Sequence, residues 1–176
     1  NAGNGRNSGH VRVYQYIDNK WLQMGGDIDG VNEDDWFGSS VDITGNPKMK
    51  IQKSGSDFYT YEWRPTLIVG APYASGLEAA PTANTGIGHA RTYNWDPPSG
   101  SNPGVWTPIH RDWDPLDANN KKLFNINGQN SSEQFGTSVS SSEIGLEFFA
   151  MGAPEVASGS VRIYEQVGWH TYLSGD

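Results

Sequence analysis

Acidic side chains crowd one short segment, which makes it the first place to look for metal chemistry. Residues 27–35 include four aspartates whose oxygens could ligate a cation: Asp27, Asp29, Asp34 and Asp35. Ca²⁺ takes six to eight oxygen ligands in proteins, and clustered carboxylates supply such ligands. A calcium site is therefore one hypothesis for this segment.

A matching segment later in the chain favours a simpler interpretation. The sequence around Gly128 repeats the pattern around Gly30, but asparagines such as Asn125 and Asn127 replace the acids. Both segments keep an Asx-Gly pair, which is typical of a tight turn. A turn is thus favoured, no cofactor is expected, and calcium remains the alternative.

Other side chains give little support for catalysis. The chain has no cysteine, which excludes disulfides and thiolate chemistry. His10 and His89 stand at matching positions of a repeated motif, but the third copy of the motif has Ser160, whereas zinc needs converging ligands. No Gly-x-Ser-x-Gly motif occurs, and nothing nominates a pair of catalytic carboxylates. We therefore predict that the chain is not an enzyme.

Aromatic side chains are the remaining candidates for binding. Trp36, Trp63, Trp95 and Trp113 are not repeated along the chain and lie in or beside predicted loops, with Tyr73 among the tyrosines nearby. Such rings could anchor long loops, contact another chain or stack on a sugar. These three interpretations stay open.

One short motif concerns modification. Asn130-Ser131-Ser132 is the single Asn-x-Ser/Thr sequence of the chain, and it stands in a predicted turn. This motif is the acceptor for N-linked glycans in secreted eukaryotic proteins. Asn130 is therefore a candidate glycosylation site.

The elements that position these residues come from an internal repeat. Residues 9–14 recur as 88–93 and again as 159–164, each with the pattern Gly-x-x-Arg-x-Tyr. Phe-Gly recurs at Phe37 and Phe135, each time followed by a later Gly-Ala-Pro. Motifs that recur in one order indicate a repeat architecture.

The repeated motifs have the two-residue period of β-strands. In residues 10–17, apolar Val11, Val13 and Ile17 alternate with Arg12 and two tyrosines. No segment shows sustained helical spacing. The sequence therefore predicts an all-β chain of ten strands: two before Phe37, four in residues 37–110 and four from Phe135 to about residue 173.

With these motifs the chain resembles the FG-GAP repeat, the blade of integrin-α-like β-propellers and of many marine bacterial and algal surface proteins. The resemblance implies about two and a half four-stranded antiparallel blades, incomplete alone and completed by neighbours. It divides the chain into a C-terminal half-blade with a linker (1–36), a blade with a long insertion (37–110), an acidic and polar linker loop (111–134) and a second blade (135–176). It also implies an extracellular or cell-surface location.

Composition limits the partners. The net charge of −8 argues against nucleic acid and anionic lipid as partners. No apolar run approaches the 18 or more residues of a membrane span. The chain opens on Asn1 and shows no signal peptide, so we expect a processed product or an excised piece.

An incomplete set of blades predicts assembly. Unpaired strands and open faces recruit neighbours, so we expect head-to-tail contacts with copies of the chain or with adjacent repeats. The predicted function is a structural or adhesive extracellular module that builds a filament or large surface protein, with a filament favoured over a ring. The alternative is a carbohydrate-binding propeller assisted by calcium. The expected interface residues are Val11, Val13, Tyr14 and Trp21 at one end, and Val161, Ile163 and Trp169 at the other.

Overall fold

The computed structural model confirms the all-β prediction. It describes residues 4–44, 50–52, 59–61, 65–75, 86–109, 125–142, 147–155, 158–167 and 170–173, and these contain fifteen strands and no helix. Accordingly, this part of the chain has no helix that could cross a membrane.

Four short strands precede the first Phe-Gly motif. They are β1 (His10–Val11), β2 (Tyr14–Ile17), β3 (Lys20–Gln23) and β4 (Ile28–Asp29). Strands β2 and β3 form a hairpin whose turn contains Asp18 and Asn19, both with positive φ, and β1 pairs with β4. The predicted strand over residues 10–17 is therefore interrupted after Val11, and β4 is a strand that the sequence did not predict.

The central sheet follows. Its strands are β5 (Ser40–Thr44), β8 (Thr66–Ala71), β9 (His89–Asp96) and β10 (Val105–Pro108), joined antiparallel in chain order. Strand β11 (Asn125–Asn127) pairs with the start of β9 and lies within the range predicted to be a linker. Strands β6 (Lys50–Gln52) and β7 (Tyr59–Tyr61) form a separate hairpin inside the long insertion between β5 and β8.

The C-terminal sheet repeats the central one. It consists of β12 (Ser138–Ser141), β13 (Glu147–Ala153), β14 (Ser160–Val167) and β15 (His170–Leu173), again antiparallel and in chain order. The pairing registers are the same in the two sheets: Ser40 faces Gly70 as Ser138 faces Gly152, and Gly70 faces Ala90 as Gly152 faces Val161. The internal repeat of the sequence is thus a repeat of structure.

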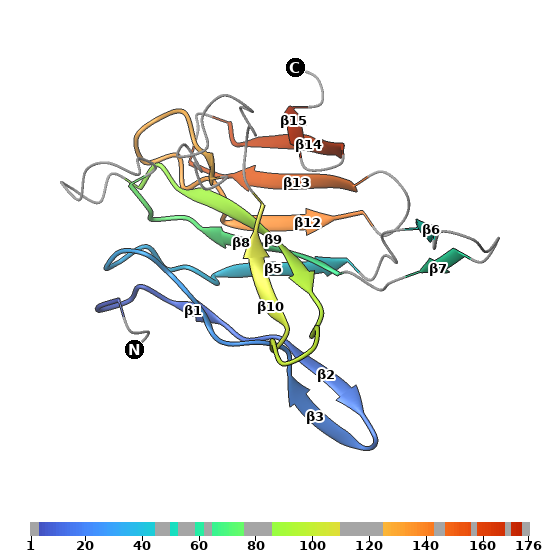
Figure 1. Ribbon diagram of the computed structural model, residues 1–176. Helices are drawn as coiled ribbons and strands as arrows, with labels where there is room; N and C mark the ends of the chain where they lie inside the picture. The colour runs from blue at the N-terminus through green and yellow to red at the C-terminus, as the bar shows by residue number, and fades with distance from the viewer. Residues whose placement is uncertain are drawn as a thin grey trace, which may run out of the picture.

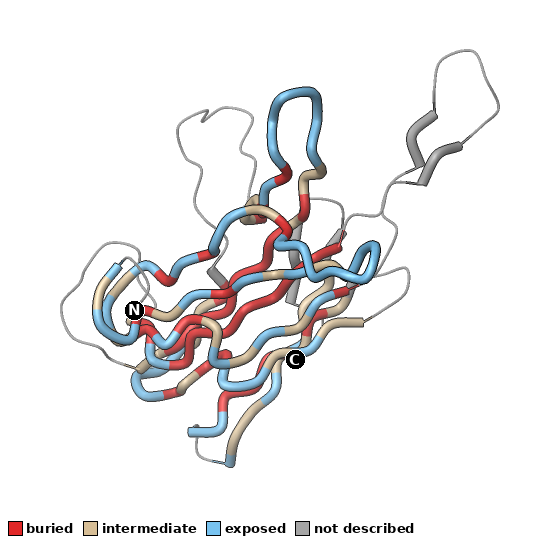
Figure 2. Tube along the Cα trace, turned by 90° about the horizontal axis from the view of Figure 1, so that it is seen from below, coloured by how far each residue is buried: buried red, intermediate tan, exposed pale blue. Residues whose placement is uncertain are grey.

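The sheets are layered, with the central one between its neighbours. Figure 1 shows the C-terminal strands on one side of β5, β8 and β9, and the N-terminal strands on the other. Two apolar clusters fill these layers, and Figure 2 shows the buried residues gathered on the inner strands. Alternate residues of β8 enter different clusters: Leu67 and Val69 pack toward the N-terminal strands, and Ile68 toward the C-terminal sheet.

Candidate functional site

Each layer joins the next through a Phe-Gly turn, which we call a corner. At the second corner, Phe135 forms a parallel β-bridge with Gly88 of the central sheet. The Phe135 amide donates to the Ile87 carbonyl at 3.0 Å, and the Gly128 amide donates to the Gly88 carbonyl at 3.0 Å. The corner is therefore a backbone junction between consecutive layers as well as an apolar contact.

The first corner has the same construction. Phe37 bridges in parallel to Gly9, and its amide donates to the Ser8 carbonyl at 3.1 Å. The Gly30 amide donates to the Gly9 carbonyl at 2.9 Å, as Gly128 does to Gly88. One junction is thus built twice, by residues far apart in the sequence.

Glycine is required at the positions where a sheet contacts the Phe-Gly corner of the next layer. Gly9 and Gly88 have φ values of 79° and 78°, and a Cβ on either would overlap the carbonyl oxygen of the phenylalanine that it receives. A Cβ on Gly70 would likewise overlap the carbonyl oxygen of Gly136. These glycines mark the acceptor side of the junction.

A buried carboxylate stands two residues before each corner phenylalanine. Glu133 is fully buried, and its carboxylate binds the Arg162 guanidinium at 2.5 Å and accepts hydrogen bonds from the amides of Gln129 and Asn130. The Arg162 guanidinium also lies 5.0 Å from the centroid of the Phe135 ring. The Arg162 guanidinium thus links the Glu133 carboxylate to the Phe135 ring beneath the corner.

Asp35 occupies the same position before Phe37. Its carboxylate accepts a hydrogen bond from the Asn32 amide at 3.1 Å. Burial raises the pKa of Asp35, while the Asn32 hydrogen bonds and the charge of Arg91 act in the opposite direction. This pairing was not predicted from the sequence, although an acid two residues before each Phe-Gly and an arginine in each Gly-x-x-Arg-x-Tyr motif could have indicated it.

The N-terminal end has an open aromatic pair with a buried counterpart in the central sheet. Trp95 and Trp106 lie opposite one another on β9 and β10, with ring centroids 5.2 Å apart. Both are buried, and the Trp106 indole donates to the Met24 carbonyl at 2.9 Å. Tyr16 and Trp21 form the matching pair on β2 and β3, 5.1 Å apart, but Trp21 is 69% exposed.

The C-terminal end has an open aliphatic face. Val161 is 67% exposed and Ile163 is 46% exposed on β14. Their counterparts on β9 are Ala90 and Thr92, which are fully buried because the C-terminal sheet covers them. The last sheet therefore presents, uncovered, the face that the central sheet buries.

An open surface pocket of about 450 Å³ adjoins this face, and we call it the corner pocket. It lies at the level of Gly152, the counterpart of Gly70, and of Gly159, the counterpart of Gly88. The lining residues are Thr137, Ser138, Gly152, Ala153, Pro154, Ser158, Gly159, Ser160 and Val161.

The four candidate metal ligands do not converge on one point. Asp27 accepts hydrogen bonds from Arg12 and Gln23, which lower its pKa to about 2. Asp29 lies in β4 and is exposed. No group of three or more metal-ligating side chains is found within the described ranges.

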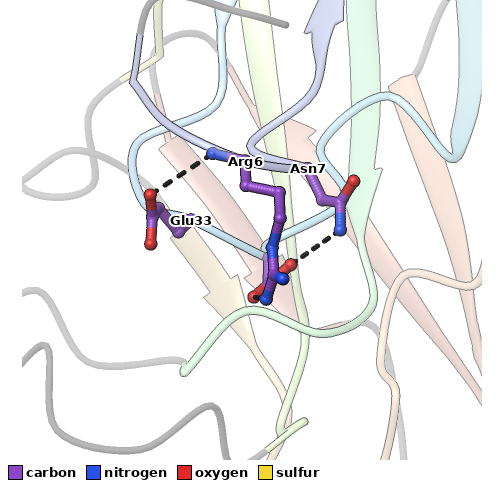
Figure 3. Close-up of polar contacts among 4 residues, drawn as sticks. Arg6, Asn7 and Glu33 are labelled. Carbon is purple, nitrogen blue, oxygen red and sulfur yellow. Dashed lines mark hydrogen bonds and ion pairs between the residues drawn. The ribbon is translucent and has the colours of Figure 1, made fainter.

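The other two candidate aspartates point to different partners. Asp34 binds the Arg6 guanidinium at 3.0 Å and the Asn7 amide group at 2.8 Å, while the Glu33 carboxylate accepts from the Arg6 backbone amide (Figure 3). These contacts tie residues 6 and 7 to the turn before the first corner. Asp35 is the buried acid described above, so three of the four candidate aspartates contact arginines or turn amides.

The predicted interface residues fall into two groups: some lie on open faces and others are packed inside the chain. Tyr14 and Trp21 lie on the open N-terminal face, and Val161 and Ile163 on the open C-terminal face. Val11 is buried and Val13 packs beside it against the central sheet, so the expectation that these two valines face a neighbour is corrected: they face the chain's own next layer.

Trp169 lies outside the described residues. In the first two repeats a tryptophan faces an aromatic residue across the hairpin: Trp21 faces Tyr16, and Trp106 faces Trp95. In the last sheet the corresponding pair is Thr171 opposite Gln166. Thr171, not a tryptophan, therefore holds the matching position in the last sheet.

The remaining candidates divide between core and surface. Trp95 is buried, whereas Trp36 and Tyr73 form an exposed pair with ring centroids 5.4 Å apart. Trp63 and Trp113 lie outside the described residues. Asn130 is exposed in its turn, so its side chain is accessible to modification.

Neither the models of known protein families nor the curated proteins compared with this chain match it.

Proposed function

We propose that this chain is a non-enzymatic structural or adhesive module of FG-GAP type, which acts outside the cell by joining blade to blade with neighbours. One observation carries the proposal. Equivalent residues of two sheets in the same register are buried in the central sheet and open in the last one, as with Ala90 and Val161. Exposed apolar faces of this kind mark interaction sites in soluble proteins.

The opposite end supports the same function. The exposed pair of Tyr16 and Trp21 has a buried counterpart, Trp95 and Trp106, that the preceding layer covers through Met24 and Gly25. A neighbour placed on Tyr16 and Trp21 would bury large rings, the side chains that contribute most to interfaces. The two ends differ, so repeated joining is head-to-tail and extends into a filament or a large surface protein.

Sedimentation velocity over a range of concentrations tests this function. The unmodified chain should associate increasingly with concentration, and the double variant Val161→Lys/Ile163→Lys should remain monomeric because it charges the open face. Val105→Lys is the matched control, since Val105 is a half-exposed valine on the edge strand β10. A chain that is monomeric at every concentration, or a control that abolishes association equally, would refute assembly through this face.

A second candidate function is carbohydrate binding. The exposed rings of Trp36 and Tyr73 favour it, because Gln134 builds the matching turn of the second corner with nearly the same φ, 51° against 56°. The fold therefore does not need a tryptophan at that position, and an exposed ring can stack on a sugar. Binding of neutral oligosaccharides that Trp36→Gln abolishes would support this function.

A further inference from the structure

The corner pocket corresponds to a site that is occupied in the central sheet. There, Gly88 bridges to Phe135, the Ser40 hydroxyl donates to the Gly136 carbonyl at 2.8 Å, and Gly70 faces that same carbonyl. The occupant is the second corner, Phe135-Gly136. The molecule thus contains its own example of what this kind of site holds.

The pocket keeps the backbone conformation of the occupied sites. Gly159 has a φ of 76°, against 79° and 78° at Gly9 and Gly88. A Cβ on Gly9 or Gly88 would overlap a corner carbonyl, whereas the nearest atoms to a Cβ on Gly159, among the described residues, are backbone atoms of Ala153 and Pro154 at 3.7 Å or more. The acceptor glycine is therefore in place, and the space in front of it is open.

The pocket also has the backbone acceptor and the apolar surface that line the occupied sites. The carbonyl of Ser158 corresponds to those of Ser8 and Ile87, which each accept the amide of a corner phenylalanine. Val161 corresponds to Ala90, which packs in the same apolar cluster as Phe135. A phenylalanine entering the pocket would meet an aliphatic surface and a backbone acceptor.

From these matches we infer that the corner pocket is an acceptor for a Phe-Gly corner of a partner blade, a segment of the form acid-x-Phe-Gly-Ser/Thr-Ser-Val. This inference rests on the proposed function and names the segment that fills the corner pocket, which is separate from the self-association through Val161 and Ile163 tested above. A folded second copy of this chain does not supply the corner, because Phe37 and Phe135 are both buried in their own copy's junctions. The partner is therefore another blade of the same type with a free corner.

Disulfide tethering tests the inference, since the chain has no cysteine of its own. Ser158→Cys places one thiol on the exposed rim of the pocket. The probe is a synthetic peptide with the sequence of residues 131–142 and cysteine in place of Gln134. The peptide is supplied as its mixed disulfide with glutathione, so that capture is a thiol–disulfide exchange that releases glutathione, and the protein–peptide disulfide is measured by mass spectrometry at equilibrium with reduced glutathione.

Capture of the peptide should depend on its phenylalanine and on the open space at Gly152 of the protein. The peptide should be captured about tenfold or more above its Phe135→Ala version, the ratio expected for burying one such side chain. Gly152→Val in the protein should reduce capture to the level of the alanine peptide by filling the pocket. Val161→Lys, at a mostly exposed position, should do the same and serves if Gly152→Val fails to fold.

The outcomes separate this inference from the proposed function. Equal capture of the two peptides, or capture unaffected by both protein variants, overturns the corner acceptor. If that happens while the chain still associates through Val161 and Ile163, the proposed function stands and its partner is a different one. Absence of both selective capture and association refutes the proposed function as well.

Discussion

The corner phenylalanines are buried side chains on which stability should depend strongly. Phe135 is fully buried between the central and C-terminal sheets and contacts Tyr164 edge to face, with centroids 6.5 Å apart. We expect Phe135→Ala to lower the free energy of unfolding by about 3–5 kcal/mol, measured by urea denaturation, because it removes apolar burial and leaves a cavity.

Val161→Ala is the control for that change. It also shortens an apolar side chain, but one that is mostly exposed, so the free energy of unfolding should change by less than about 0.5 kcal/mol. A cost below about 1 kcal/mol for Phe135→Ala would contradict the role of the corner as core.

His89 makes the fold sensitive to acid. Burial lowers the pKa of His89 to about 3, with a smaller contribution from the charge of Arg91, and its buried Nε2 has no hydrogen-bond partner among the residues that the structure describes. In the unfolded chain His89 binds a proton near pH 6.5, whereas in the folded chain it binds one only near pH 3. Stability should therefore fall as pH drops through this window, by up to about 1.4 kcal/mol per pH unit.

Denaturation in urea between pH 7 and pH 4 measures this effect. His89→Gln should flatten the dependence of the unfolding free energy on pH, because glutamine does not titrate. His10→Gln makes the same replacement at the exposed matching position of the first repeat and serves as the control variant. Identical pH profiles for unmodified chain and His89→Gln would show that His89 is not the group responsible.

Sequence reasoning could identify the repeated residues but not their surroundings. The recurrence of Phe37 and Phe135 predicted equivalent positions, and the structure gives them equivalent bridges. The same reasoning treated Val11 and Val161 as equally exposed, although one is buried and the other open. Alternation shows which side of a strand a residue occupies, but whether a further layer covers that side depends on tertiary structure.

At the scale of elements, matched registers allow a direct comparison of an occupied and an open acceptor site. Gly70→Val would drive a side chain into the Gly136 backbone, whereas a Cβ at Gly152 would overlap the Ser138 hydroxyl, which can rotate away, and would lie 3.9 Å from the Ser138 carbonyl oxygen. We expect Gly70→Val to cost at least about 2 kcal/mol by overpacking. Gly152→Val should cost less than about 1 kcal/mol, and thermal or urea denaturation of the two variants measures the difference.

Similar losses in both variants would mean that the two sites are not equivalent. Full tolerance of Gly70→Val would contradict the close approach of the second corner to β8. The comparison uses one substitution in one local fold, so intrinsic strand propensity contributes equally to both results.

Element prediction from the sequence succeeded where pairing is local. The four strands of the C-terminal sheet follow from short apolar runs and turns, because neighbours in the chain pair with one another. Strands β4 and β11 were missed because each is two or three residues long and pairs with an earlier segment across an intervening hairpin or sheet. Hairpin β6–β7 was missed because a long polar insertion gives a weak alternating pattern.

At the scale of the whole molecule, the two ends are chemically unlike. The N-terminal end presents the rings of Tyr14, Tyr16 and Trp21, and the C-terminal end presents Val161, Ile163 and the corner pocket. Unlike ends favour ordered joining over pairing of identical faces, because an isologous contact needs a self-complementary surface.

Metal removal should have little effect on the whole molecule. Asp27 and Asp34 form ion pairs with Arg12 and Arg6, and Asp35 is held by the Asn32 amide. We expect the melting temperature in EDTA to match that in buffer with added calcium. A clear rise with calcium would indicate a bound ion that stabilises the folded state, since a ligand that binds only the folded state raises its stability.

The parallel bridges at the corners also have a mechanical consequence. Each corner inserts into the layer before it, so two layers pulled apart along the stack must break the backbone hydrogen bonds at Phe37 or Phe135 together with an apolar interface. Bonds that break together resist tension better than bonds that open one by one. In a filament of such modules under tension, a sheet would therefore unfold from its free edge before the hydrogen bonds at the corners break. The filament would lengthen while its modules stay joined.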